Sequence, residues 1–249
     1  MSDSMDLSRA SRIRLALSHA AADLADRATG LTRTGTDGGP GDVTEEAQRL
    51  VAAAEQVMQL AVLYDRRRGA PWAAIGEALG EVSKQTAHER YAEADKNVDE
   101  AIIEHWLTGD AGTAGLPSGA EASPETLTRL DEWTAERYRY VDVIDDDPDH
   151  QVSAGLTPMS TAEHAAMITA AEALLLKAAA SGGPARHQAL EIGYARRKVE
   201  RYERLIADET AAPGITGTPL PELRERLAGA RARLTEVKTG IPSREHPAT

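Results

Sequence analysis

The stretch GAPWAAIGEALGEVSKQTAHERYAEA, residues 69–94, carries two short apolar patterns of helical spacing with glycine between them. Trp72, Ile75 and Leu79 recur three and four residues apart, which places them on one face of a helix. Gly80 suits the positive φ that ends a helix, and Ser83 suits the N-cap of a second helix. The stretch therefore predicts two packed helices joined by a tight turn.

The first of these helices is expected at about 71–79 and the second at 83–94, with an alternative end for the second at Trp106. Gly76 would allow the two helices to approach closely, and Val82 would fill the turn. In the second helix, Ala87 and Tyr91 lie one turn apart and would point inward. The remaining polar positions point outward or flank that face: Lys84, Gln85, Thr86, His88, Glu89 and Arg90.

These outward residues have the chemistry of a DNA-reading surface. Gln85 can form a bidentate pair with adenine, and Lys84 can reach guanine or a phosphate. Ser83 and the free amides at the helix start suit a phosphate. The candidate DNA-binding residues are Ser83, Lys84, Gln85, Thr86, His88 and Arg90, with Arg66, Arg67 and Arg68 just before the motif as candidate grips on the DNA backbone.

The segment resembles the helix-turn-helix of sigma-factor region four and of many actinobacterial regulators. The matching residues are Trp72, Ile75, Gly76, Leu79, Gly80, Val82, Ser83, Thr86, Ala87 and Arg90. The resemblance covers only residues 45–95 and implies sequence-specific DNA binding through the helix that starts at Ser83, with transcriptional regulation as the expected role. One departure is Glu81, an extra residue that lengthens the turn and places a carboxylate near the expected phosphates.

An alternative is a scaffold or protein-interaction protein whose helix-turn-helix contacts protein. The formal net charge of −12 argues against a generic nucleic-acid binder. Glu77, Glu81, Glu89 and Glu93 favour this alternative. Residues 66–90 nevertheless hold five basic and three acidic side chains, a modest positive excess.

The composition predicts an all-α protein. Aromatic residues make up 4%, Phe and Cys are absent, and alanine-rich segments favour closely packed helices. The absence of cysteine excludes disulfides and thiolate chemistry. We expect no signal peptide and no membrane span, and hence a cytoplasmic protein without membrane partners.

Other helices follow from periodicity and capping residues. A first helix is expected from about Asp6 to Ala28, with one apolar stripe at Ile13, Leu17, Ala20, Leu24 and Ala28. The glycine-rich stretch after it should be a mobile loop. Thr44 is the expected N-cap of a second helix with a broad apolar face, which stops near Gly69.

Residues 108–124 are expected to be a linker between a helix-turn-helix domain (1–107) and a helical dimerisation or interaction domain (125–240), followed by a disordered tail (241–249). In the second domain, Pro124 after Ser123 should open one helix, and Ser160 or Thr161 should cap a helix that runs to Ala179. Pro184 should start another.

Two stripes in the second domain have the rhythm of a coiled-coil seam. They comprise Ile192, Ala195, Val199, Tyr202 and Ile206, then Leu220, Leu223, Leu227, Ala230, Leu234 and Val237. A short Pro/Gly loop joins them, so an antiparallel helical hairpin is expected. Its stripes are a natural homodimer surface or contact for a protein partner, although they can also be satisfied within one chain.

The remaining sequence patterns favour structural roles over functional ones. The basic face over 195–205 is expected to pair with neighbouring acids, with phosphate binding as the alternative. The acidic stretch 142–149 lacks the ligand spacing of a cation loop. No catalytic motif, metal-ligand spacing or nucleotide fingerprint is present, so we expect no enzyme activity, cofactor or metal.

Overall fold

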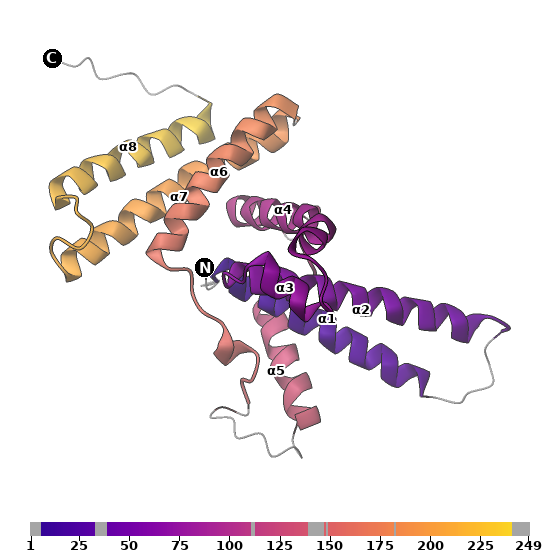
Figure 1. Cartoon of the computed structure of the whole chain (residues 1–249). Coiled ribbons are helices and arrows are strands. Elements are labelled where there is room, and N and C mark those ends of the chain that lie inside the picture. Colours follow the sequence, from indigo (N-terminus) through magenta and orange to yellow (C-terminus); the bar gives the residue numbers. More distant parts are fainter. Residues whose placement is uncertain are drawn as a thin grey trace. The chain divides into compact units, whose positions relative to one another are not determined.

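The computed structural model describes residues 6–32, 39–110, 113–138, 147, 149–181 and 183–240, and Figure 1 shows their helices. In these ranges the elements are α1 (Arg9–Leu31), α2 (Asp42–Arg67), α3 (Trp72–Ala78), α4 (Lys84–Thr108), α5 (Pro124–Tyr138), the 3₁₀ turn η1 (Ser153–Gly155), α6 (Thr161–Ser181), α7 (Pro184–Ala211) and α8 (Leu220–Thr239). The described residues contain no strand, only an isolated bridge between Leu7 and Pro158. The all-α class is confirmed.

Serine hydroxyls cap the starts of four helices. Each hydroxyl oxygen accepts a hydrogen bond from the amide three residues later, at 3.1 Å in every case; the caps are Ser8, Ser83, Ser123 and Ser160. This geometry satisfies an amide that has no partner inside the helix. The expected starts of α4, α5 and α6 are therefore correct, and Ser160 rather than Thr161 is the cap of α6.

The first two helices start at other residues than expected. α1 begins at Arg9 because Ser8 caps it, not at Asp6. Thr44 is not a cap: α2 begins at Asp42 after Gly41, whose φ is +105°. The Asp42 carboxylate accepts a hydrogen bond from the Gly39 amide at 2.7 Å, and the helix begins three residues earlier than a Thr44 cap would place it.

The chain divides into two compact units that alternate along the sequence. Unit 1 comprises Met1–Asp99 and Gly115–Pro158, and unit 2 comprises Glu100–Ala114 and Met159–Thr249. The expected boundary at 108–124 differs from this division. The reason is packing: α5, although it follows the expected linker, packs against α1 rather than against the later helices.

α5 packs against α1 through an apolar core. Leu7, Leu15, Ala22, Leu130 and Leu156 are buried there, with Leu127 and Trp133 packed against them. Leu15 and Ala22 lie outside the single apolar stripe expected for α1, so this helix buries a second face. A one-dimensional stripe cannot reveal that face, because its partner α5 lies about a hundred residues away in the chain.

Asp131 on α5 holds the segment that contains η1. Its buried carboxylate accepts hydrogen bonds from the Val152 amide at 2.8 Å, the Ser153 amide at 3.0 Å and the Ser153 hydroxyl at 2.6 Å. A buried carboxylate with three donors is well compensated for its lost hydration.

In unit 2, α7 and α8 form the expected antiparallel hairpin, and α6 packs against α7. Ala195 and Val199 of α7 and Leu223 and Val237 of α8 are buried. The hairpin loop is held by Glu209, whose carboxylate accepts from the Gly214 amide, the Thr216 amide and the Thr216 hydroxyl. These hydrogen bonds lower the pKa of Glu209, and the bond from the Gly214 amide has the largest effect.

Candidate nucleic-acid interface

The turn between α3 and α4 is tight because the backbone of α3 at Gly76 contacts the backbone of the turn at Val82. A Cβ built on Gly76 would lie 2.3 Å from the Val82 carbonyl oxygen, and the Val82 amide donates to the Gly76 carbonyl at 3.0 Å. Gly80 has φ +92° and Glu81 has φ +64°. The extra residue of the turn, Glu81, is thus accommodated in the left-handed region, which costs energy for a non-glycine residue.

The inner faces of α3 and α4 meet in one apolar cluster. Val62, Ile75, Ala87 and Tyr91 are buried in it. The partly buried residues packed against them are Ala70, Trp72, Leu79 and Val82. The inward positions expected in this stretch are therefore confirmed, and the start of α4 is fixed on α2 and α3 by close packing.

The outer face at the start of α4 is polar and exposed. Exposed side chains fill it: Ser83, Lys84, Gln85, Thr86, His88, Glu89 and Arg90. Some of them make contacts within the chain. Gln85 donates from Nε2 to Glu89 at 2.9 Å, and the His88 ring meets the Trp72 ring edge-on, with centroids 5.4 Å apart.

The three arginines at the end of α2 have three different environments. The Arg66 guanidinium lies 4.6 Å from the centroid of the Trp72 ring. Arg67 is turned inward, with its side chain 15% exposed, and pairs with Asp95 at 2.7 Å and Asp99 at 3.2 Å. Arg68 is exposed.

Arg67 therefore has a structural role: it fixes the orientation of α4 relative to α2. Its geometry does not fit the expected grip on a DNA backbone, which leaves Arg66 and Arg68 as candidates for that contact. The pair with Asp95 gives no local sequence signal, because the two residues are on different helices and 28 positions apart.

Acidic side chains share this surface. Glu77, Glu81, Glu89 and Glu93 are all exposed. The surface is therefore of mixed sign, and any phosphate contact must come from the cations at the start of α4 and the end of α2 rather than from a general positive field.

The second basic candidate, residues 195–205, has a structural role within unit 2. Arg196 donates to the Leu107 carbonyl at 2.7 Å, and Arg197 donates to the Trp106 carbonyl at 2.9 Å and 2.7 Å. These are carbonyls of the last turn of α4, which have no partner inside the helix. Arg197 also pairs with Glu200 at 2.7 Å, as the ion-pair interpretation of this face expected.

The acidic stretch 142–149 lies mostly outside the described residues; of its described members, Asp147 accepts from His150 at 2.9 Å. Across the described ranges, no group of three or more His, Cys, Asp or Glu side chains is arranged to hold a metal ion. Nor does any described helix combine the length and apolarity needed to cross a bilayer.

Comparison with known proteins gives no match: no protein family, no curated protein and no solved structure is significantly similar to this chain. The interpretation of the site therefore depends on its own geometry.

Proposed function

We propose that unit 1 binds double-stranded DNA in a sequence-specific way and that the protein regulates transcription. One observation carries the proposal: the first turns of α4 present exposed donors and acceptors on one face while the opposite face is buried in the α2–α3–α4 cluster. A helix held in this manner can enter a major groove without the entropic cost of becoming ordered on binding.

The proposed roles follow the chemistry of each side chain. Gln85 and Lys84 read base edges, while Ser83, Thr86 and the α4 amides contact a phosphate. Gln85 must release Glu89 to do so, which costs little because an exposed hydrogen bond is replaced by water or base contacts. The proposed flanking contacts are Arg66, Arg68, Arg90 and His88.

The test is selection of bound fragments from random double-stranded DNA at low salt, followed by titration of the enriched sequence against salt. We expect affinity to fall steeply with salt, since phosphate contacts release counterions. Replacing Lys84 and Gln85 together by Ala should reduce the preference for the selected sequence about tenfold or more. Replacing Lys96 and Asn97, which are exposed further along α4, provides the matched control and should leave the preference unchanged.

Failure to enrich any fragment at about 50 mM salt would refute DNA binding. It would favour the competing function, a helix-turn-helix that contacts a protein. The specific observation in favour of that function is the set of exposed glutamates around the turn, which suits a basic protein surface better than a phosphate backbone.

A homodimer is part of the proposal, because one recognition helix gives limited specific affinity and paired half-sites double the contacts. The hairpin stripes of α7 and α8 are partly used within the chain: Ala195, Val199, Leu223 and Val237 are buried, and the remaining stripe residues are partly buried. An exposed apolar stripe remains on α2, in the same unit as the helix-turn-helix: Val43, Ala47, Val51, Ala54 and Met58.

This α2 stripe has the three- and four-residue spacing of a coiled-coil seam, and Val43, Val51 and Met58 are 72%, 54% and 47% exposed. We propose that a second copy covers it. Val51→Glu should convert the dimer to monomer in sedimentation experiments, whereas Gln48→Glu, which adds the same charge on a neighbouring face of α2, should not. A monomeric wild-type protein at all concentrations would refute the dimer.

A further inference from the structure

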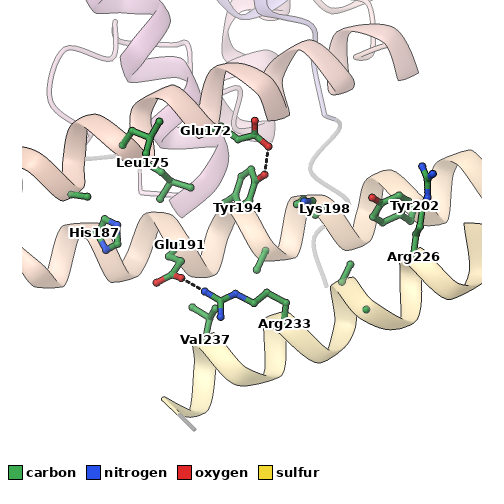
Figure 2. Close-up of a pocket in the computed structure, with 15 residues that line it drawn as sticks. Glu172, Leu175, His187, Glu191, Tyr194, Lys198, Tyr202, Arg226, Arg233 and Val237 are labelled. Atoms are coloured by element: carbon green, nitrogen blue, oxygen red, sulfur yellow. Dashed lines mark hydrogen bonds and ion pairs between the residues drawn. The ribbon is translucent and has the colours of Figure 1, made fainter. Parts of the chain in front are cut away.

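Unit 2 contains a groove of about 660 Å³ that the proposed DNA-binding function does not use. Figure 2 shows it, with α7 between α6 and α8. Its apolar lining comes from all three helices: Leu175, Leu176, Ala179, Ala195, Gly229, Ala230 and Val237. Leu176 is 75% exposed and adds to the apolar surface that the other lining residues form together; a contiguous apolar surface of this kind can mark a binding groove.

Four of the eight polar side chains that line the groove are bonded to one another. Tyr194 donates a hydrogen bond to Glu172, and Arg233 pairs with Glu191 at 2.6 Å, as the dashed lines in Figure 2 mark. Burial and the bond to Glu172 raise the pKa of Tyr194, so its hydroxyl stays a donor. Arg226 pairs with Glu222 on its own helix.

Lys198 differs from the other cations of the groove. Its ammonium lies 5.4 Å from the centroid of the Tyr194 ring, and in Figure 2 it stands between Tyr194 and Tyr202. No carboxylate in the described part of the chain pairs with it. Of the two carboxylates in the lining, Glu191 pairs with Arg233 and Glu172 accepts the Tyr194 hydroxyl. Among the described residues, Lys198 is therefore the cation of the lining that has no ion pair.

We propose that this groove binds a small apolar or aromatic molecule that carries one anionic group, with Lys198 receiving the anion. The volume lies within the range of small-molecule sites, which combine mostly apolar walls with a few polar groups that fix orientation. The apolar residues of α6 and α8 would cover the body of such a ligand, and its anionic group would give Lys198 a counter-ion. The site lies within unit 2 and does not depend on DNA binding by unit 1.

The structure offers a sharp way to block the site. A Cβ on Gly229 meets no atom within 4 Å, so a larger side chain there would enter the groove without forcing the helices apart. Gly229→Leu should therefore occlude the site and at the same time favour the helix. Ala228→Leu, at an exposed neighbouring position outside the groove, is the matched control.

The probe is 8-anilinonaphthalene-1-sulfonate, an aromatic anion whose fluorescence rises in apolar sites, added to the full-length protein. We expect saturable binding that Gly229→Leu weakens at least about tenfold and Ala228→Leu leaves unchanged. Lys198→Met should weaken it about tenfold, and Lys198→Arg should restore it. Decanoate should displace the probe, and decyltrimethylammonium should not.

Three results would overturn the proposal. The first is no saturable fluorescence rise with wild-type protein, and the second is equal displacement by the cationic and anionic competitors. The third is a change of molecular mass in sedimentation caused by Gly229→Leu, which would identify a second copy as the occupant. Each measurement reports on unit 2 and is made without DNA. Failure of the ligand proposal can therefore be distinguished from failure of the DNA-binding proposal.

Discussion

Gly76→Ala tests the packing on which the helix-turn-helix depends. In an ordinary helix this change is stabilising by about 1 kcal/mol, because glycine loses more backbone entropy on folding. Here the new methyl group would lie 2.3 Å from the Val82 carbonyl oxygen, whereas ordinary contacts begin near 3.4 Å. The turn must therefore move by about 1.1 Å, because the atom that the methyl group meets belongs to the turn backbone and cannot rotate away as a side chain could.

The magnitude follows from two losses and one gain. Overpacking of this kind costs about 1–3 kcal/mol, and the Val82 amide loses its 3.0 Å bond to the Gly76 carbonyl, worth about 1 kcal/mol. The gain in helix propensity offsets about 1 kcal/mol. We expect a net destabilisation of about 1–3 kcal/mol and a weaker affinity for any selected DNA, since the start of α4 shifts.

The assay is denaturant unfolding combined with amide hydrogen exchange. Gly30→Ala is the matched control: Gly30 lies in α1 of the same unit, and a Cβ there meets nothing within 4 Å. It should be neutral or stabilising, so the two glycine-to-alanine changes should have opposite signs. If Gly76→Ala leaves stability and the exchange protection of the Val82 amide unchanged, the close approach of α3 and its turn is refuted.

Three further predictions concern single polar anchors. Arg67→Met leaves the Asp95 carboxylate without its cation and should lower stability by about 1–3 kcal/mol, seen as faster exchange along α4; an unchanged exchange pattern would argue against this anchor. Asp131→Ala strands two amides, one of them that of Ser153, and should cost about 2–4 kcal/mol in thermal unfolding, whereas no shift in midpoint would contradict the buried geometry. Glu209→Gln should destabilise unit 2 at neutral pH. Because the pKa of Glu209 is lowered in the folded state, its contribution is present above the unfolded pKa and lost as pH falls through the folded pKa. The deficit of the variant should therefore shrink as the pH is lowered below the ordinary pKa of a glutamate. A deficit that is constant with pH would show that the charge is not involved.

The sequence by itself determined the local features of this protein. Helix class, the serine caps at Ser83 and Ser123, the inward positions Ala87 and Tyr91 and the α7–α8 hairpin all follow from spacing and capping chemistry within a few residues. Such features depend on hydrogen bonds and faces inside one helix or across one short loop, which is the range over which a linear pattern carries information.

Only the tertiary structure decided which surfaces are free and which are used. It placed α5 on α1, turned Arg67 toward Asp95, and buried only part of the α7–α8 stripes while it left the α2 stripe exposed. It also formed the groove in unit 2 around Lys198. Each of these outcomes depends on which helices meet at long range, and amphipathic stripes of similar apolarity do not specify their partners; the packing of the whole unit does.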